Sequence, residues 1–279
     1  MPFTILKKQE LVPTLHRMDI AAPRVAEKAM PGQFVILRID ECGERIPLTI
    51  ADFDAADGTV TLIFQEIGKT TCQLASLGAG DSIADLAGPL GCASTIEKFG
   101  TVVCVGGGVG IAPIFPIARG LMEAGNKVIS IIGARSADIL FWEERMKEAS
   151  SELYVTTDDG TKGHHGFVTD IVQNVIESGE QVDRVIAIGP PVMMRAVAGV
   201  TKPFGIKTVV SLNPIMVDGT GMCGACRVLV GGVTKFACVD GPEFDAHEVD
   251  FTLLMSRLAM YLPEEREALD YKAAEDPAV

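Results

Sequence analysis

Short apolar runs rich in β-branched residues alternate with turn residues through the first third of the chain. The runs FVILRI (34–39), IPLTIAD (46–52) and TVTLIFQEI (59–67) are bounded by Gly, Asp and Pro, which is the pattern of strands separated by turns. The following KTTCQLASLG (69–78) has the pattern of a short helix that ends at a glycine. Several strands with a single helix and no regular alternation predict a small antiparallel β-barrel over residues 1–97.

From residue 101 onwards, strand-like and helix-like patterns alternate. The strand-like segments are TVVCVGGG, KVISIIGAR, LYVTTDD, DRVIAIGP and KTVVSL, and the helix-like segments are IAPIFPIARGLMEAG, FWEERMKEA, GFVTDIVQNVIESG and PVMMRAVAGV. This alternation predicts a doubly wound α/β domain over residues 98–212, with a parallel sheet and helices on both faces. The uncharged run 99–118 has the length of a membrane span, but its glycines and two prolines favour a strand, a turn and a helix.

Residues 213–279 begin with a loop that holds three cysteines and continue into the segment VDFTLLMSRLAMYL. Four apolar residues of that segment recur at helical spacing, namely Phe251, Leu254, Leu258 and Tyr261. They predict a terminal helix whose apolar stripe packs on the core. The chain is therefore expected to be an α+β multidomain protein, with a barrel, a doubly wound domain and a C-terminal cysteine segment.

Composition and charge exclude several classes of partner. Apolar residues make up 48% of the 279 residues and charged residues 22%, as in globular proteins. The formal net charge of −13 argues against binding to nucleic acid or to an anionic membrane, because both need positive surface. The start, MPFTILKKQELVPTL, lacks the apolar core of a signal peptide, and seven cysteines in such a chain indicate a reducing, cytoplasmic location. Four of them are scattered in apolar segments and are expected to be buried and inert, namely Cys42, Cys72, Cys92 and Cys104.

A glycine-rich turn, GGGVGIAP, stands between the first strand and the first helix of the doubly wound domain. Glycines let backbone amides approach a pyrophosphate, and the following helix N-terminus favours anionic oxygen. Tight packing of the strand on the helix is the alternative explanation. The segments GARS, TTDDG and GPP end other strands, where ligands of such folds bind. The candidate nucleotide-binding residues are Gly107, Gly108, Gly110, Arg135, Asp158, Asp159, Gly189 and Pro190.

The cysteine spacing admits two kinds of metal site. Zinc would need a fourth ligand after Cys223, Cys226 and Cys238, and His247 is the nearest downstream candidate. Plant-type 2Fe-2S sites show C-x4-C-x2-C with a later fourth ligand, and Asp218 stands where the first thiolate of that pattern would be. Asp218 is followed by a glycine, so spacing alone leaves open whether it is a ligand or a turn residue.

The combined motifs resemble the ferredoxin–NADP reductase superfamily. The resemblance rests on a barrel followed by GGGxGxAP, GARS, DDGxxG and a GP turn. It implies that the barrel holds FAD and that the second domain binds the nicotinamide nucleotide. Carried onto this chain, it implies that ERIPLTIAD and IGKTT contact FAD through Arg45, Pro47, Leu48, Thr49, Gly68, Thr70 and Thr71.

The resemblance implies specific positions for these residues: Thr49 would lie by the reactive flavin nitrogen, Arg45 would lie near the diphosphate, and Gly68, Thr70 and Thr71 would cradle the diphosphate. The sequence departs from the superfamily where Ile46 replaces the usual arginine and Leu48 replaces a stacking aromatic residue.

The cysteine segment carries a narrower resemblance. DGTGMCGACRV followed by KFACVDGPEFDAHEVDF is similar to the small subunits of NADH-dependent reduced ferredoxin:NADP+ oxidoreductases (the Nfn type) and of sulfide dehydrogenases. The related electron-transfer subunit of dihydroorotate dehydrogenase uses four cysteines. The resemblance implies a 2Fe-2S cluster held by Asp218, Cys223, Cys226 and Cys238.

The resemblance also implies a function and partners. Electrons would pass between NAD(H), FAD and the 2Fe-2S cluster within a flavin-based electron-bifurcating enzyme. A larger glutamate-synthase-like subunit with its own flavin and 4Fe-4S clusters would carry the ferredoxin and NADP+ chemistry, so ferredoxin would be an indirect partner. No catalytic acid–base residue is expected. Arg135 followed by Ser136 would also accept an NADP phosphate, and the family favours NAD(H).

Two alternatives stay open. The chain could serve a dihydroorotate or sulfide dehydrogenase, or it could be a zinc-stabilised, non-catalytic module.

Overall fold

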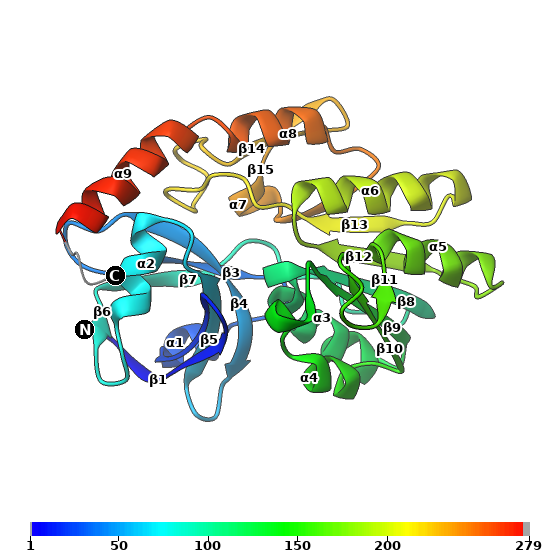
Figure 1. Cartoon of the computed structure of the whole chain (residues 1–279), viewed down its shortest axis with the longest axis horizontal. Helices are drawn as coiled ribbons and strands as arrows, with labels where there is room; N and C mark the ends of the chain where they lie inside the picture. Colours follow the sequence, from blue (N-terminus) through cyan, green and yellow to red (C-terminus); the bar gives the residue numbers. More distant parts are fainter. Residues whose placement is uncertain (1, 276–279) are drawn as a thin grey trace.

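A seven-stranded antiparallel sheet, curled into a nearly closed barrel, forms the N-terminal part of the protein (Figure 1). The computed structural model describes residues 2–275. The strands follow the order β6-β1-β2-β5-β4-β3-β7. Their bounds are β1 Phe3–Val12, β2 Leu15–Ala21, β3 Phe34–Arg38, β4 Arg45–Asp54, β5 Thr59–Gln65, β6 Ser82–Ile83 and β7 Asp85–Leu90. The predicted barrel is confirmed.

The interior of the barrel is filled by alternate side chains of its strands. Met18 on β2, Leu37 on β3 and Leu62 on β5 are fully buried, as expected where one face of each strand points inward. Two helices accompany the sheet, α1 (Pro23–Ala26) and α2 (Lys69–Ser76), and Leu74 of α2 joins the barrel core. This packing fixes α2, and with it the GKTT segment, on the barrel.

A second seven-stranded sheet, in the order β11-β10-β9-β8-β12-β13-β16, forms the doubly wound part. Its strands are β8 Thr101–Gly107, β9 Lys127–Ala134, β10 Glu152–Thr157, β11 His164–His165, β12 Arg184–Ile188, β13 Thr208–Ser211 and β16 Glu243–Asp245. Its helices are α3 Ile111–Glu123, α4 Glu143–Glu148, α5 Val168–Glu177 and α6 Pro191–Thr201. The strands from β8 to β13 pair in parallel, which confirms the doubly wound prediction.

Both faces of the central strand β8 are covered. Val102 and Cys104 pack in the core with α3 and α4, whereas Val103 and Val105 pack in the core with α5 and α6. This burial explains why the strand reads as a continuous apolar run. The run 99–118 is accordingly a strand, a 3-10 turn and a helix, as predicted. Within residues 2–275, no helix combines the length and apolar composition that crossing a bilayer requires.

The C-terminal segment lies across the other two parts (Figure 1). It contains β14 (Arg227–Val230) and β15 (Val233–Phe236), a two-stranded sheet, and then α7 (Ala237–Asp240). Strand β16 pairs antiparallel with β13 at the edge of the doubly wound sheet. The segment ends with α8 (Phe251–Leu258) and α9 (Leu262–Glu275).

The predicted apolar stripe of the terminal helix is correct for Phe251, Leu254 and Leu258, which pack on the core, and wrong for Tyr261. Phe251 and Leu254 are buried on α8, but Tyr261 is 49% exposed, in the break before α9. A continuous helix is disfavoured there because Pro263 has no N–H to donate to the preceding turn, while it is well tolerated in the first turn of a new helix.

The prediction of four buried, inert cysteines is correct for Cys104 and wrong for two others. Burial raises the pKa of the Cys104 thiol to about 12. Cys72 is half-buried, whereas Cys42 and Cys92 are exposed. Cys42 lies in the turn between β3 and β4, and Cys92 lies in the connection after β7, so neither belongs to the apolar element beside it.

Candidate cofactor sites

Strand β4 divides the predicted flavin-binding residues between the two faces of the barrel wall. Because successive side chains in a strand point to opposite faces, Pro47 and Thr49 lie on one face and Leu48 on the other. Leu48 packs against the barrel interior. Pro47 and Thr49 are the register partners of Ile36 and Phe34 on β3, and these two side chains pack in one cluster with the cysteine segment. The face that carries Pro47 and Thr49 therefore adjoins the cysteines.

Arg45, for which a diphosphate role was expected, contacts the cysteine segment. Its Nε donates a hydrogen bond of 3.2 Å to the carbonyl oxygen of Val217. The preceding residue, Glu44, accepts a hydrogen bond of 2.6 Å from the hydroxyl of Thr70, in the first turn of α2. Arg45 therefore contacts the cysteine segment, whereas the neighbouring Glu44 contacts α2.

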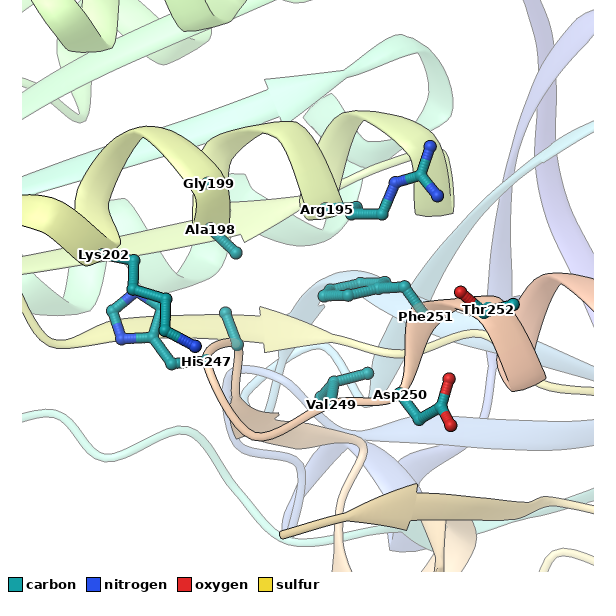
Figure 2. A pocket seen from close by; sticks show the side chains of 10 residues that line it. Arg195, Ala198, Gly199, Lys202, His247, Val249, Asp250, Phe251 and Thr252 are labelled. Atoms are coloured by element: carbon teal, nitrogen blue, oxygen red, sulfur yellow. The ribbon is translucent and has the colours of Figure 1, made fainter. Parts of the chain in front are cut away.

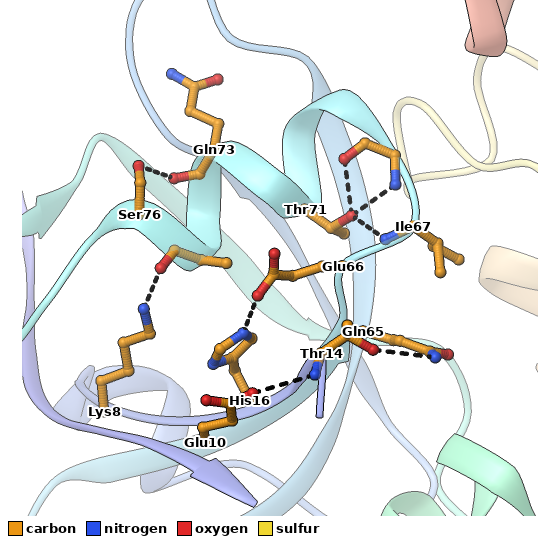
Figure 3. Close-up of polar contacts among 12 residues, drawn as sticks. Lys8, Glu10, Thr14, His16, Gln65, Glu66, Ile67, Thr71, Gln73 and Ser76 are labelled. Carbon is orange, nitrogen blue, oxygen red and sulfur yellow. Dashed lines mark hydrogen bonds and ion pairs between the residues drawn. The ribbon is translucent and has the colours of Figure 1, made fainter. Parts of the chain in front are cut away.

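The GKTT segment forms the N-terminus of α2 (Figure 3). The Thr71 hydroxyl accepts hydrogen bonds from the N–H groups of Ile67 (3.1 Å) and Gly68 (3.0 Å), and it donates to the Gly68 carbonyl. Gly68 faces open space, because a Cβ there would have no neighbour closer than 4.0 Å. The first N–H groups of a helix have no partner within the helix and attract anions. This segment therefore offers a diphosphate its backbone N–H groups, while the Thr71 hydroxyl maintains the turn.

In the glycine-rich turn between β8 and α3, some glycines allow close backbone packing and another leaves the N-terminus of α3 accessible. A Cβ on Gly110 would lie 2.1 Å from the carbonyl oxygen of Ile188, so only glycine fits there. Gly107 is covered by the thioether of Met193, 2.2 Å from such a Cβ. Gly108 has φ +55°, and a Cβ there would meet no atom within 4 Å. The packing explanation therefore accounts for Gly110, while Gly108 leaves the N-terminus of α3 open to a pyrophosphate.

The other predicted nucleotide-binding residues gather at the same edge of the sheet. They are Arg135 after β9, Asp158 and Asp159 after β10, and Gly189 and Pro190 after β12. A Cβ on Gly189 would lie 2.9 Å from the carbonyl oxygen of Gly107, so the GP turn contacts the glycine-rich turn. The Asp159 carboxylate accepts hydrogen bonds from the hydroxyl (2.6 Å) and N–H (3.0 Å) of Thr161, which lower the pKa of Asp159. Asp159 is thus engaged in its own turn, whereas Arg135 is exposed.

Asp218 and the three cysteines of the C-terminal segment form two pairs. Cys226 and Cys238 are each 2% exposed, and their Sγ atoms lie 3.2 Å apart. Cys223 is exposed, and its thiol is close enough to Asp218 for the carboxylate charge to act on it. Three glycines of this loop have positive φ, as a chain that curls closely around a bound group requires: Gly219 (81°), Gly221 (86°) and Gly224 (67°).

The thiols of Cys223 and Cys238 differ in how readily they ionise. Backbone hydrogen bonds from Ala225 and Asp218 hold the pKa of the Cys223 thiol below its ordinary value of 9.0. Burial, followed by the hydrogen bond with Cys226, raises the pKa of Cys238 to about 12. Two buried sulfurs in contact do not both ionise without a cation, and metal binding is what deprotonates such thiols.

Asp218 forms the turn that the sequence allowed. Its Oδ2 accepts hydrogen bonds from the N–H (2.9 Å) and the hydroxyl of Thr220, which lower the pKa of Asp218. An ionised carboxylate offers about four acceptor positions. The turn therefore leaves capacity for a metal, and the turn and ligand roles are compatible.

Asp218 and the three cysteines supply four donors, the number that a 2Fe-2S cluster takes from the protein. Within residues 2–275, no three His, Cys, Asp or Glu side chains gather around one point as a single ion requires. Zinc sites need such a gathering, and His247, the remaining zinc candidate, is hydrogen-bonded at 3.0 Å to Thr201 of α6. A 2Fe-2S cluster instead takes two protein ligands on each of its two irons. The pairs Asp218–Cys223 and Cys226–Cys238 match that requirement.

Two cavities of the described structure lie apart from the predicted flavin, nucleotide and cluster residues. One, of about 290 Å³, lies between α6 and α8 and is lined by Arg195, Lys202, His247 and Phe251 (Figure 2). The other, of about 400 Å³, lies on the outer side of the barrel. Neither is lined by a residue predicted to bind a cofactor.

A cluster that the sequence did not reveal joins the barrel to the doubly wound part. Asp52 of β4 forms ion pairs with Arg119 of α3 (2.9 Å) and Arg145 of α4 (2.5 Å). The Arg145 guanidinium lies 4.2 Å from the ring centroid of Phe115 and 4.3 Å from that of Trp142. Within the sequence, the only signal is an acid inside the apolar part of a strand.

Two family models match the chain. The iron–sulfur cluster binding domain of dihydroorotate dehydrogenase B matches residues 213–250, and the oxidoreductase NAD-binding domain matches residues 104–199. These ranges cover the cysteine pairs and the glycine-rich turn respectively.

Curated proteins and a solved structure are similar over nearly the whole chain. A dihydroorotate dehydrogenase B (NAD(+)) electron transfer subunit homolog of Thermotoga maritima is 48% identical, covering 94% of this chain and 92% of that protein. The electron transfer subunit of dihydroorotate dehydrogenase B of Bacillus cereus is 32% identical, covering 88% and 96%. A chain from the structure of an NADH-dependent reduced ferredoxin-NADP oxidoreductase, described for flavin-based electron bifurcation, is 45% identical, with a TM-score of 0.91 and 96% of each chain covered.

Proposed function

Because the chain belongs to the family of reductase-like electron-transfer subunits found in dihydroorotate dehydrogenase B and in the NADH-dependent reduced ferredoxin–NADP oxidoreductase, we propose that it transfers electrons between NAD(H), FAD and a 2Fe-2S cluster. The observation that carries this proposal is the position of the two ligand pairs. Asp218, Cys223 and Cys226 lie on one loop and Cys238 lies on α7. Cys226 and Cys238 pack in one cluster with Phe34 and Ile36 of β3, the strand that pairs with β4, and these two strands are expected to carry the flavin.

Each part of the chain has a role in this scheme. Thr49 and Pro47 present the outer face of β4 to the flavin ring, and the N-terminus of α2 receives the diphosphate. The turn around Gly108 and the strand ends near Arg135 and Asp158 bind the nucleotide. Asp218, Cys223, Cys226 and Cys238 hold the cluster. When bound, the flavin converts a two-electron hydride donor into a one-electron source, which is the use of having a flavin beside an iron–sulfur cluster.

We propose further that the chain is the NAD(H)-reacting subunit of an electron-bifurcating ferredoxin:NADP+ oxidoreductase in the cytoplasm. Its partner would be a larger, glutamate-synthase-like subunit with its own flavin and 4Fe-4S clusters. The aspartate in the ligand set supports this choice over a dihydroorotate dehydrogenase, whose corresponding subunit is expected to supply four cysteines. NADH is the proposed nucleotide, although Arg135 is exposed and offers a cation to a 2′-phosphate.

The test is anaerobic addition of NADH or NADPH to the purified protein. We expect about one FAD and two irons per chain, with the flavin absorbance bleached by NADH faster than by NADPH. A colourless protein that contains zinc and no flavin would refute the proposal. A clear preference for NADPH would reverse the nucleotide assignment alone.

A dihydroorotate dehydrogenase subunit is the second candidate, because the family model over residues 213–250 and several relatives carry that name. The two candidates share the NADH half-reaction and differ in the partner. Co-purification of the native complex, followed by identification of the co-eluting subunit, distinguishes a glutamate-synthase-like protein from a dihydroorotate dehydrogenase.

A further inference from the structure

The loop that carries Asp218 is anchored to the barrel at two points. The first is the hydrogen bond of 3.2 Å from Arg45 Nε to the carbonyl oxygen of Val217, the residue before Asp218. The second is Gly219, the residue after Asp218. A Cβ on Gly219 would lie 2.6 Å from Ile36 Cγ1, so the backbone of the loop rests directly on β3.

Both anchors lie on the face that carries the flavin signature. Ile36 is the register partner of Pro47, and Arg45 begins β4 two residues before Pro47. The side chains of Arg45, Pro47 and Thr49 share this face because strand side chains alternate. The same strand therefore presents the flavin-binding residues and holds the residue next to the proposed iron ligand.

Arg45 differs from the neighbouring arginine of β3 in what it contacts. It forms no ion pair within residues 2–275, and its side chain donates a hydrogen bond to the Val217 carbonyl instead. Arg38, its register partner on β3, is by contrast paired with Asp85. Glu44 accepts a hydrogen bond from Thr70 in the first turn of α2, where the diphosphate is expected. The Glu44 carboxylate, and not the Arg45 guanidinium, therefore lies at the expected diphosphate site.

We propose that Arg45 is a positioning residue of the cluster loop: through its hydrogen bond to the Val217 carbonyl it fixes the backbone next to Asp218, so that the carboxylate is oriented toward the iron. This inference rests on the proposed function, since it presupposes the cluster. It replaces the diphosphate role expected for Arg45. Partners of metal ligands contribute strongly to affinity, and their loss weakens metal binding by about 10–100-fold.

Four proteins test the assignment: the wild type, Arg45→Ala, Arg45→Lys and the matched control Arg38→Ala, which removes a cation from the opposite position of β3. For each, we would measure FAD per chain, the rate of iron release to a chelator, and the EPR signal of the reduced protein. We expect Arg45→Ala to keep FAD at the wild-type ratio, to release iron about tenfold faster or more, and to show altered g values.

Arg45→Lys keeps the charge and one donor, so it should release iron more slowly than Arg45→Ala, and Arg38→Ala should behave as the wild type. Loss of FAD from Arg45→Ala with unchanged iron release would restore the diphosphate role and overturn the proposal. Unchanged FAD and iron release in Arg45→Ala, or equal lability of Arg45→Lys and Arg45→Ala, would also overturn it. A wild-type protein without flavin and iron would instead refute the proposed function, so the two failures are distinguishable.

Discussion

Removal of Asp52 tests how the barrel is joined to the doubly wound part. The Asp52→Ala substitution leaves Arg119 and Arg145 without their shared carboxylate. Arg145 is the more sensitive of the two, because its Nη1 is buried and has no hydrogen-bond partner within the described residues even in the wild type. In the variant, the Arg145 guanidinium would stay against the rings of Phe115 and Trp142, and its Nη2 would lose the Asp52 carboxylate while its Nη1 stays without a partner.

The magnitude follows from how exposed each partner is. The side chains of Asp52 and Arg145 are 14% and 30% exposed, and that of Arg119 is 36% exposed. Breaking a fully buried ion pair from one side costs about 3–5 kcal/mol, and an exposed pair contributes about 1 kcal/mol or less. The Asp52 pairs lie between these limits, so we expect a loss of about 2–3 kcal/mol in the free energy of unfolding.

Thermal unfolding of the purified holoprotein measures this loss. At about 2–4 °C for each kcal/mol, the midpoint of Asp52→Ala should fall by about 4–12 °C. Asp57→Ala is the matched control, because Asp57 is an exposed acid in the turn that follows β4. A second arm places Asp52→Ala in an Arg145→Met background, where the buried cation is absent and the further loss should be about 1 kcal/mol or less. Equal midpoints for Asp52→Ala and Asp57→Ala would refute the reasoning.

Four further substitutions test the buried acid, the glycine-rich turn and the proposed carboxylate ligand. Glu243→Gln should stabilise the protein more at pH 8 than at pH 5. Burial raises the pKa of Glu243 above 4.5, so the wild type loses stability as the pH rises from the unfolded-state pKa through the raised folded-state pKa. An equal shift in the thermal midpoint at pH 5 and pH 8 would contradict this. Gly110→Ala should abolish nucleotide binding or folding, whereas Gly108→Ala should cost about 1–2 kcal/mol because only its φ is unfavourable; equal NADH affinity and midpoints would contradict the packing argument. Asp218→Ala should lower the iron content and change the EPR signal of the reduced protein, and an unchanged signal would exclude the carboxylate as a ligand.

Strand β4 connects the three parts of the molecule. Its first residue, Arg45, holds the cysteine segment, Thr49 lies on the face expected to carry the flavin, and Asp52 pairs with two helices of the doubly wound part. The barrel residues Ala51 and Ile63 also pack in the core that contains α3. The three parts of the molecule are thus held together by contacts from one continuous strand and by shared apolar cores.

The two sheets could be predicted from the sequence because the periodicity of buried side chains is a local property. Strand β4 has one face in the barrel core, so its buried and less buried side chains alternate, whereas β8 is buried on both faces and is therefore a continuous apolar run. The glycine-rich turn was found for the same reason, since its chemistry lies in a single short segment.

Contacts between distant segments could not be predicted in this way. Arg45 and Val217 are 172 positions apart, and Asp52 and Arg145 are 93 apart, so neither contact leaves a periodic signal. The break before α9 was missed although Pro263 marks it, because the apolar spacing continues through Tyr261. The spacing of Asp218 from Cys223 suggested a possible ligand, and the structure adds that its turn leaves acceptor positions.

The most direct test of the central claim is an anaerobic reductive titration of the purified protein, followed by absorption and by EPR. We expect uptake of about three electrons per chain, two by the flavin and one by a 2Fe-2S cluster that then gives an EPR signal of about one spin per chain. NADH alone should bleach the flavin. Uptake of two electrons or fewer, with no iron-derived signal at any point of the titration, would contradict the account.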